Sequence, residues 1–311
     1  MYIYLKSQVL ANRFNMQEYN TKKPQQIALI TGSSSGIGLE TSLLLARNGI
    51  YTFATMRNLS NSKVVQDIAR NENLPLKILS LDVTKKNSIR SAIEKIKSEQ
   101  DRIDILVNNA GYSLIGALEQ LSITEIKHEF ETNFFGVINL IQSVLPVMRK
   151  QRSGRIINIS SLAGRIGFPL SSAYNSSKFA LEGLSESLRY EVNGFGISII
   201  LIEPGVVKTN FVKNLKIGKQ VSEKSNNAKM LNTNLPYADI TQKRIAAFKG
   251  RFEKGTSPKA VADTVLKAAT TINPKFRYVV GQDAMKLIDL KNNTTDEIFG
   301  KIVMKSVLEA S

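Results

Sequence analysis

The chain has 311 residues, of which 42% are hydrophobic, enough to bury a sizeable core and typical of a globular protein. Its net charge is +16, but the basic residues are dispersed and not interleaved with aromatic ones, so no nucleic-acid partner is expected. The chain has no cysteine and one histidine, His128. This composition excludes disulfides and thiol nucleophiles, and it argues against a Ser-His-Asp triad or a metal site.

The N-terminal segment does not resemble a targeting signal. Residues 1–24 mix polar, basic and aromatic residues without the apolar core and cleavage site of a signal peptide. We expect a partly ordered arm there, with either Met1 or Met16 as the start. No window approaches the roughly 18 consecutive apolar residues of a membrane span. Together with the absence of cysteine, these features favour a cytoplasmic protein.

The folded region is expected to open with a strand, a glycine-rich turn and a helix. Residues 26–30 are a short run of strand formers, and 39–48 carry helical periodicity. Between them lies Thr31-Gly32-Ser33-Ser34-Ser35-Gly36-Ile37-Gly38. Glycines in such a turn let the backbone approach a pyrophosphate closely, and the N–H groups at the helix start attract its charge. This order of elements predicts a dinucleotide-binding unit.

The end of the second strand bears on the choice of dinucleotide. We expect this strand over 50–56, and an acidic residue at its end would hold the ribose hydroxyls of NAD. The sequence has Arg57 there instead. A guanidinium pairs with a 2′-phosphate, which a carboxylate would repel. The sequence therefore favours NADP(H) over NAD(H), unless Arg57 is simply a solvent-facing residue at a strand end.

Strands and helices alternate along most of the remaining chain. Further strands are expected over 77–81, 103–107, 154–159, 197–202 and 276–280, and helices over 87–99, 123–150, 172–192, 257–271 and 285–308, the last with a break near 291–295. This alternation predicts an α/β fold with one Rossmann-type, doubly wound parallel sheet of about seven strands and helices on both faces. We expect one catalytic domain over 25–282, with a substrate loop over about 207–256, and a C-terminal helical extension over 283–311.

A tyrosine and a lysine one helical turn apart are candidates for chemistry. Tyr174 and Lys178 share a face if this stretch is helical. The ammonium would favour the phenolate and lower the pKa of Tyr174 from about 10. Such a tyrosine can give a proton to a carbonyl oxygen or take one from an alcohol. For the pair taken alone, two surface residues at helical spacing are the simpler interpretation.

Further motifs surround this pair in order along the chain. They are Thr31-Gly32-x-x-x-Gly36-x-Gly38, Asp82, Asn108-Asn109-Ala110-Gly111, Asn133, Ser161, Tyr174-x-x-x-Lys178, and Pro204-Gly205 with Thr209. With these motifs, residues 26–280 resemble the short-chain dehydrogenase/reductase family. The segments 54–57, 179–183 and 277–281 resemble its hydroxysteroid- and retinol-dehydrogenase-like branch.

The resemblance implies four catalytic residues. Tyr174 would be the general acid/base, and Lys178 would lower its pKa and bind the nicotinamide ribose. Ser161, 13 residues before Tyr174, would hold the substrate oxygen and stabilise the charge developing on it. Asn133 would hold a water that links Lys178 to solvent, unless it only bonds locally within its helix.

The resemblance also implies the contacts of the cofactor. Asn109 would hold the adenosine side or merely brace the sheet. The whole cofactor-binding set comprises Thr31, Gly32, Ser34, Gly36, Ile37, Gly38, Arg57, Asp82, Val83, Asn109, Tyr174, Lys178, Pro204, Gly205, Val207 and Thr209. Within it, Ser34 and Arg57 would take the 2′-phosphate, Asp82 and Val83 would flank the adenine, and Val207 and Thr209 would meet the carboxamide.

The sequence thus predicts an NADP(H)-dependent oxidoreductase that moves a hydride between nicotinamide and a hydrophobic ketone, aldehyde or secondary alcohol. One alternative is a 3-oxoacyl-thioester reductase whose basic C-terminal third meets an acidic carrier. Another is an NADP-binding sensor without turnover. By resemblance, a homodimer or homotetramer is expected, formed through the helices that carry Asn133 and Tyr174.

Overall fold

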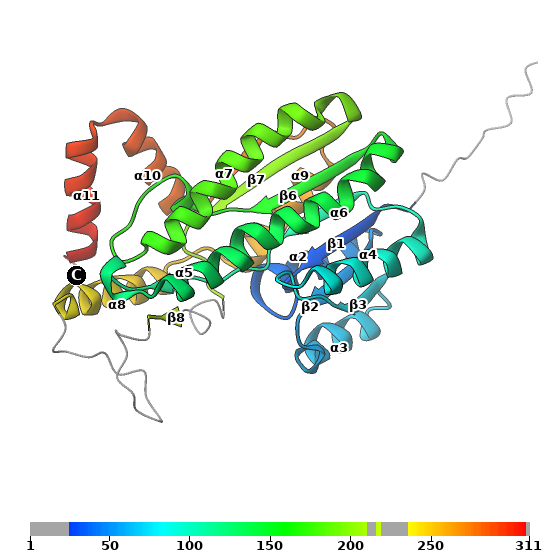
Figure 1. Cartoon of the computed structure of the whole chain (residues 1–311), viewed down its shortest axis with the longest axis horizontal. Helices are drawn as coiled ribbons and strands as arrows, with labels where there is room; N and C mark the ends of the chain where they lie inside the picture. The colour runs from blue at the N-terminus through cyan, green and yellow to red at the C-terminus, as the bar shows by residue number, and fades with distance from the viewer. Residues whose placement is uncertain (1–24, 210–215, 219–235, 309–311) are drawn as a thin grey trace, which may run out of the picture.

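A seven-stranded parallel sheet forms the centre of the molecule (Figure 1). The computed structural model describes residues 25–209, 216–218 and 236–308, so the expected N-terminal arm, Met16 and much of the expected substrate loop lie outside them. The strands follow the order β3-β2-β1-β4-β6-β7-β9. Their bounds are β1 Ile27–Thr31, β2 Tyr51–Met56, β3 Leu76–Ser80, β4 Ile105–Asn108, β6 Gly154–Ile159, β7 Ile197–Pro204 and β9 Arg277–Val280. The doubly wound α/β class predicted from the sequence is confirmed.

Helices cover both faces of this sheet. One face carries α4 (Lys86–Gln100), α6 (Gly136–Gln151) and α7 (Ser172–Val192), and the other carries α2 (Gly36–Arg47), α3 (Lys63–Asn71) and α9 (Pro258–Thr270). Short 3₁₀ turns connect some of them: η1 (Leu59–Ser62), η2 (Leu118–Gln120), η4 (Leu162–Gly164) and η5 (Asn193–Phe195). None of the described helices is both long enough and apolar enough to cross a membrane.

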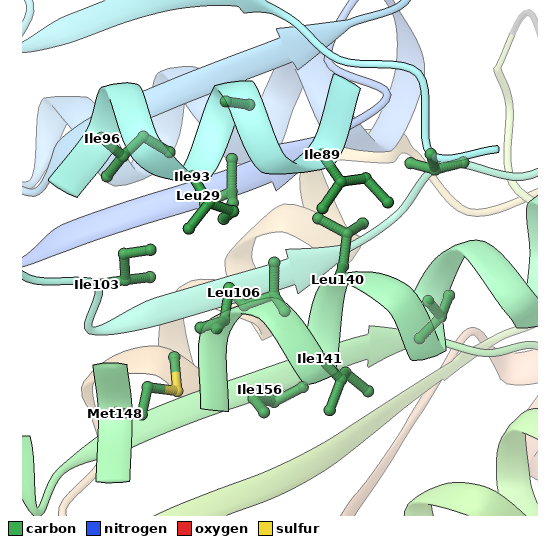
Figure 2. Packing of buried hydrophobic residues seen from close by; sticks show 14 of the residues in the cluster. Leu29, Ile89, Ile93, Ile96, Ile103, Leu106, Leu140, Ile141, Met148 and Ile156 are labelled. Carbon is green, nitrogen blue, oxygen red and sulfur yellow. The ribbon is translucent and has the colours of Figure 1, made fainter. Parts of the chain in front are cut away.

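Strand side chains alternate between two cores, one on each face. In β1, Leu29 belongs to the core beneath α4 and α6, whereas Ala28 and Ile30 belong to the core beneath α2 and α9. Figure 2 shows Ile93 of α4 and Leu140 of α6 in the same cluster as Leu29. Fully burying each such side chain stabilises the fold by about 1.5–3 kcal/mol. Because both faces are covered, the central strands β1 and β4 are buried along their whole length and consist mostly of apolar residues.

The helix expected over 123–150 is interrupted. It consists of α5 (Ile123–Phe130), a π turn η3 (Glu131–Phe135) and α6. The π turn carries Asn133, which is 1% exposed. Its Oδ1 accepts a hydrogen bond from the Tyr112 N–H at 3.1 Å, and its Nδ2 donates to the Tyr112 carbonyl at 2.9 Å. These bonds to a neighbouring loop help to offset the poorer geometry of the wide turn, which periodicity cannot predict.

The segment expected to be a substrate loop is partly regular. It contains the sixteen-residue helix α8 (Ala238–Glu253) and the strand β8 (Lys216–Ile217), which pairs with β5 (Leu114–Ile115). α8 packs against α11 (Asp296–Leu308), which follows α10 (Gln282–Asn293). These three helices gather at one end of the molecule (Figure 1). Helical periodicity is faint in α8 because two of its three buried residues are Thr241 and Arg244.

Candidate active site

A cleft of about 1960 Å³ runs along the carboxyl edge of the sheet. Parallel strands bring their following turns to one edge, so residues far apart in the sequence meet there. Most of the residues singled out from the sequence line it: Gly32, Ser34, Gly36, Ile37, Arg57, Asp82, Val83, Asn109, Ser161, Tyr174, Lys178, Pro204, Gly205, Val207 and Thr209. Thr31, Gly38 and Asn133 stand behind this lining.

The glycine turn between β1 and α2 has the features of an anion cradle. Gly32 and Gly36 have φ of +70° and +60°, a conformation that side-chain-bearing residues rarely adopt. Ser35, the N-cap of α2, makes no side-chain capping bond, and the first turn of α2 has no acidic residue. The N–H groups at the start of α2 are therefore available to a pyrophosphate, which fits a dinucleotide.

The turn is held in place from behind by β4. The Thr31 hydroxyl oxygen accepts hydrogen bonds from the N–H groups of Asn109 and Ala110, each at 3.0 Å. In return, Asn109 Nδ2 donates to the carbonyls of Thr31 and Gly32 at 2.8 and 3.1 Å. Of the two roles considered for Asn109, bracing is the one these contacts support. Thr31 is buried, and its hydroxyl takes part in the same bracing contacts.

The far end of the cleft is polar. Arg57 is exposed immediately after β2 and lines the cleft together with Ser34. Asp82 Oδ1 accepts hydrogen bonds from the N–H and hydroxyl of Thr84 at 3.0 and 2.8 Å, which fixes the loop that carries the buried Val83. The geometry is compatible with the expected adenine pocket and with a phosphate at Arg57.

Tyr174 and Lys178 project into the cleft from the first turns of α7. The Lys178 Nζ lies 5.8 Å from the centroid of the Tyr174 ring and donates to the Ile159 carbonyl at 2.8 Å. Burial raises the pKa of Tyr174 to about 12, although a hydrogen bond from Ser161 opposes the shift. Burial also lowers the pKa of Lys178 to about 8. The predicted lowering of the Tyr174 pKa is thus wrong for the protein alone, because desolvation of the phenolate dominates and the charge of Glu129 acts in the same direction.

Ser161 contacts Tyr174 directly, whereas Asn133 is connected to it through Ser177. Ser161 follows β6, caps the short turn η4 by accepting from the Ala163 N–H at 3.1 Å, and bonds to Tyr174. Asn133 Nδ2 donates to Ser177 Oγ at 3.2 Å, in addition to its bonds with Tyr112. The hydroxyl of Ser177 in turn donates to the Tyr174 carbonyl at 2.8 Å. Asn133 therefore supports the start of α7, and its water-holding role stays a prediction.

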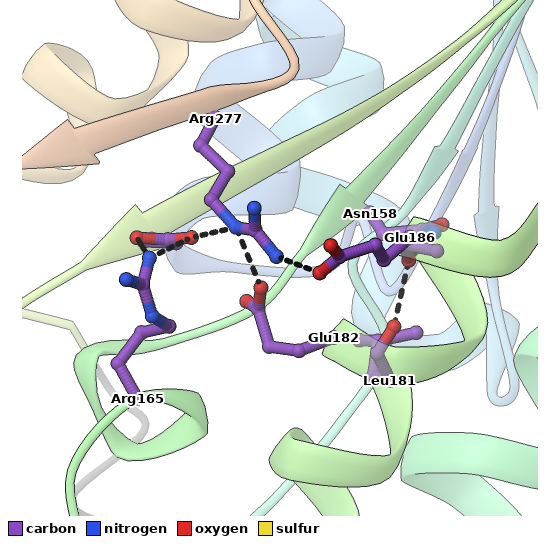
Figure 3. Close-up of polar contacts among 8 residues, drawn as sticks. Asn158, Arg165, Leu181, Glu182, Glu186 and Arg277 are labelled. Atoms are coloured by element: carbon purple, nitrogen blue, oxygen red, sulfur yellow. Dashed lines mark hydrogen bonds and ion pairs between the residues drawn. The ribbon is translucent and has the colours of Figure 1, made fainter. Parts of the chain in front are cut away.

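An ion-pair network fixes α7 against the sheet. Figure 3 shows Arg277 of β9 reaching Glu182 and Glu186 of α7, with N–O distances of 3.1 and 2.9 Å. The same guanidinium lies 3.1 Å from the fully buried Glu203 of β7, which Arg165 also contacts at 3.3 Å. Burial raises the pKa of Glu203 to about 7. Since α7 also carries Tyr174 and Lys178, this network contributes to holding the helix on which both residues lie.

Two acidic residues of the site were missed by sequence reasoning. Glu129 lies in the helix expected over 123–150 but was not singled out; it is fully buried, and its Oε1 accepts a hydrogen bond from the Leu114 N–H at 2.8 Å. Burial raises its pKa to about 7, against the pull of Lys178 and Lys216. Asp283 accepts from the Val206 N–H at 2.8 Å. Its place just after a strand is a signal that could have revealed it, whereas Glu129 gave none.

The comparisons with known proteins identify the family. The short chain dehydrogenase family model matches residues 26–220, and the chain therefore belongs to that family. It is an oxidoreductase of the type that acts on CH–OH and keto groups with a nicotinamide dinucleotide.

Two curated relatives illustrate the likeness in sequence. A 3-ketodihydrosphingosine reductase of Bacteroides thetaiotaomicron is 39% identical over 257 residues, which cover 82% of this chain and 88% of that protein. Retinol dehydrogenase 8 of Bos taurus is 37% identical over 269 residues, or 85% of this chain and 84% of that protein.

Solved structures share the fold. A short-chain dehydrogenase from Streptomyces avermitilis has a TM-score of 0.74 and 29% identity, covering 91% of this chain and 96% of its own. A metagenomic oxidoreductase in complex with NADP has a TM-score of 0.63 and 23% identity (82% and 96% covered). A Burkholderia phymatum enzyme in complex with NAD has a TM-score of 0.72 and 20% identity (86% and 93% covered). The fold therefore occurs with either dinucleotide, and side chains must decide between them.

Proposed function

We propose that the protein is an NADP(H)-dependent oxidoreductase that interconverts a hydrophobic ketone or aldehyde and the corresponding alcohol. The observation that carries this proposal is the grouping of Ser161, Tyr174 and Lys178 in one cleft with a glycine turn whose helix N–H groups are free of side-chain caps. The bound nicotinamide would supply or accept the hydride.

The protonation states of the site suit carbonyl reduction. With a pKa of about 12, the Tyr174 hydroxyl keeps its proton at neutral pH and can give it to a carbonyl oxygen. Ser161, which bonds to Tyr174, would donate to the same oxygen and stabilise the charge developing on it. Lys178, with a pKa of about 8, is mostly cationic at pH 7. Its charge would favour transfer of the Tyr174 proton and help to restore it afterwards.

The preference for NADP(H) rests on Arg57. This guanidinium stands at the end of β2, where it lines the cleft beside Ser34. A guanidinium can pair with a 2′-phosphate through two parallel hydrogen bonds, and this interaction has no equivalent in NAD(H).

Part of the substrate end of the cleft is lined by apolar side chains. Its lining includes Leu114, Ile115, Leu162, Phe168, Ile217 and Leu287, which favours a substrate with an extended hydrophobic part. The relatives named for a ketosphingoid base and for retinol are compatible with such a substrate.

The test is reduction of a panel of hydrophobic ketones and aldehydes with NADPH, in the protein and in Tyr174→Phe. We expect wild-type turnover and a loss of kcat by roughly 10²–10⁴-fold in the variant, with NADPH binding by fluorescence unchanged. A variant that keeps near-normal turnover would refute the role of Tyr174. Tight NADPH binding without oxidation by any carbonyl in the panel would favour the sensor instead, and turnover of an acetoacetyl thioester alone would favour the thioester reductase.

A further inference from the structure

The cleft contains an arginine that is buried without a complete set of hydrogen-bond partners. Arg244 of α8 is 7% exposed and lines the substrate end. Its Nε and Nη1 are buried and have no hydrogen-bond partner among the residues that the structure describes. Burial lowers its pKa to about 10, and the nearby Arg251 adds to the shift. At neutral pH the guanidinium is still charged, so two donors of a buried cation lack an acceptor.

Two aromatic rings orient this guanidinium, but they do not accept hydrogen bonds from its N–H groups. The Cζ of Arg244 lies 5.7 Å from the centroid of the Phe168 ring and 5.8 Å from that of Phe248. Cation–π contacts of this kind stabilise a desolvated cation by up to about 2 kcal/mol. They offer no oxygen to the N–H groups, so the planar group is held in place with its donors unused.

The charges around Arg244 are predominantly positive. Arg251 and Lys286 line the same end of the cleft. Arg251 donates a hydrogen bond to the Ser306 carbonyl. This carbonyl is neutral, so it does not compensate the positive charge of Arg251. Asp283 lines the cleft as well. It accepts a hydrogen bond from the Val206 N–H at 2.8 Å and attracts the charge of Arg251. An anion at Arg244 would therefore meet Arg251 and Lys286 as further cations, with Asp283 as an opposing carboxylate.

Arg244 is connected to the catalytic tyrosine through one loop. The Phe168 ring faces Arg244, and the Phe168 N–H donates to Asn175 Oδ1 at 3.2 Å. Asn175 is the neighbour of Tyr174 in α7, and its Nδ2 also donates to the Ala163 carbonyl at 2.7 Å. Tyr174, Phe168 and Arg244 line one continuous cleft. A substrate with its carbonyl at Tyr174 can therefore extend toward the guanidinium.

We propose that Arg244 is a specificity residue that binds an oxyanionic group, a carboxylate or a phosphate, carried by the hydrophobic substrate. This inference rests on the carbonyl-reductase function proposed above and adds the charge of the substrate to it. A planar guanidinium can bind either oxyanion through two parallel hydrogen bonds, and such a ligand would satisfy the donors that the protein leaves unpaired. The same arrangement disfavours a substrate with an ammonium group at this position.

The test uses ketones of matched chain lengths that end in a carboxylate, a phosphate, a methyl ester or a trimethylammonium group. For wild type we expect kcat/KM for the better oxyanion to exceed that for the ester on the order of 100-fold, the range for a desolvated charge pair. Arg244→Met should remove most of this preference while retaining turnover of the ester. Arg244→Lys should keep part of it, and Lys243→Met should keep all of it, since Lys243 pairs with Asp239 at 2.8 Å on the exposed side of α8.

The outcomes separate this inference from the function on which it rests. Turnover of the ester that depends on Tyr174, without a preference for either oxyanion, would overturn the inference alone. An equal loss for all substrates in Arg244→Met would assign Arg244 a structural role and overturn it too. If no ketone is reduced, the proposed function fails, and thermal shifts with the matched hydroxy acid and hydroxy ester still decide the inference. If Arg244→Met does not fold, the wild-type preference decides it.

Discussion

The two ends of the cleft are built in different ways. The cofactor end consists of turns directly after β1, β2, β3 and β4, where backbone N–H groups and a short glycine motif form the contact surface. The substrate end consists of side chains from β5, β8, α8 and α10, which are far apart in the sequence. The first end is defined by backbone geometry within a few residues. The second depends on how distant elements pack.

This difference explains which end is adaptable. A backbone cradle recognises what all dinucleotides share, a pyrophosphate, and it tolerates little change. α8 and α10 lie outside the central sheet, so substrate specificity can diverge through their side chains. Arg244 and Asp283 belong to this second group, whereas Gly38 and Thr31 belong to the first. Substitutions at each end should therefore have effects of different size and kind.

The largest effect is expected for Gly38→Ala at the cofactor end. A Cβ at this position would lie 2.3 Å from the Gly32 carbonyl oxygen and 2.5 Å from Asn109 Nδ2, so the turn and α2 must move apart. We expect NADPH affinity to fall on the order of 100-fold or more and the free energy of unfolding to fall by about 1–3 kcal/mol. Fluorescence titration and urea unfolding measure the two effects.

The matched control is Gly250→Ala at the other end. Gly250 is exposed within α8. Apart from its chain neighbours and the backbone of its own helix, no heavy atom of the described residues would lie within 4 Å of a Cβ there. Alanine there should raise the free energy of unfolding by about 0.5–1 kcal/mol through helix propensity and leave NADPH affinity unchanged. If both substitutions changed NADPH affinity and the free energy of unfolding equally, the glycine turn would be no more sensitive to an added side chain than the exposed face of α8.

The next effect is expected for Arg57→Asp, which tests a side chain within the backbone-dominated end. A carboxylate at the end of β2 would repel a 2′-phosphate and could accept hydrogen bonds from the ribose hydroxyls. The ratio of kcat/KM for NADPH to that for NADH should fall on the order of 100-fold, as expected for the loss of a charged pair and the gain of a like-charge repulsion. An unchanged ratio would show that Arg57 does not read the phosphate.

The sequence predicted the fold well because its strands are buried on both faces. Runs such as 26–30 and 197–202 are mostly apolar, so their strands could be located to within one or two residues of β1 and β7. The doubly wound class followed from the alternation of strands and helices along the chain. α8 escaped prediction because its buried face includes Thr241 and Arg244, and the π turn escaped because side-chain bonds of Asn133 to a distant loop support it.

Within the site, predictability followed the same division. The cofactor turn could be read from local spacing, and the structure places Gly32, Gly36 and Arg57 along the cleft. The roles of buried charges could not be read in this way. Burial depends on tertiary packing. The fold buries Tyr174, which raises its pKa, and it buries Glu129 completely. A pattern of residue types indicates which groups can react, but their pKa values depend on the finished fold.

The smallest effect is expected for Glu129→Gln, which tests buried charge near the substrate end. In the cofactor-free protein, burial raises the pKa of Glu129 from 4.5 to about 7. Between these values the folded state binds more protons than the unfolded state, so this carboxyl makes the free energy of unfolding fall as pH rises from about 4.5 through 7.

The Glu129→Gln variant removes this contribution. The difference in unfolding free energy, variant minus wild type, should therefore rise by about 2 kcal/mol between pH 5 and 7. Glu203, whose pKa is also raised to about 7, titrates in both proteins and cancels in the difference. Urea unfolding at several pH values measures this quantity. A constant difference would mean that Glu129 stays ionised in the folded state, with Lys178 and Lys216 supplying enough compensation to outweigh its burial.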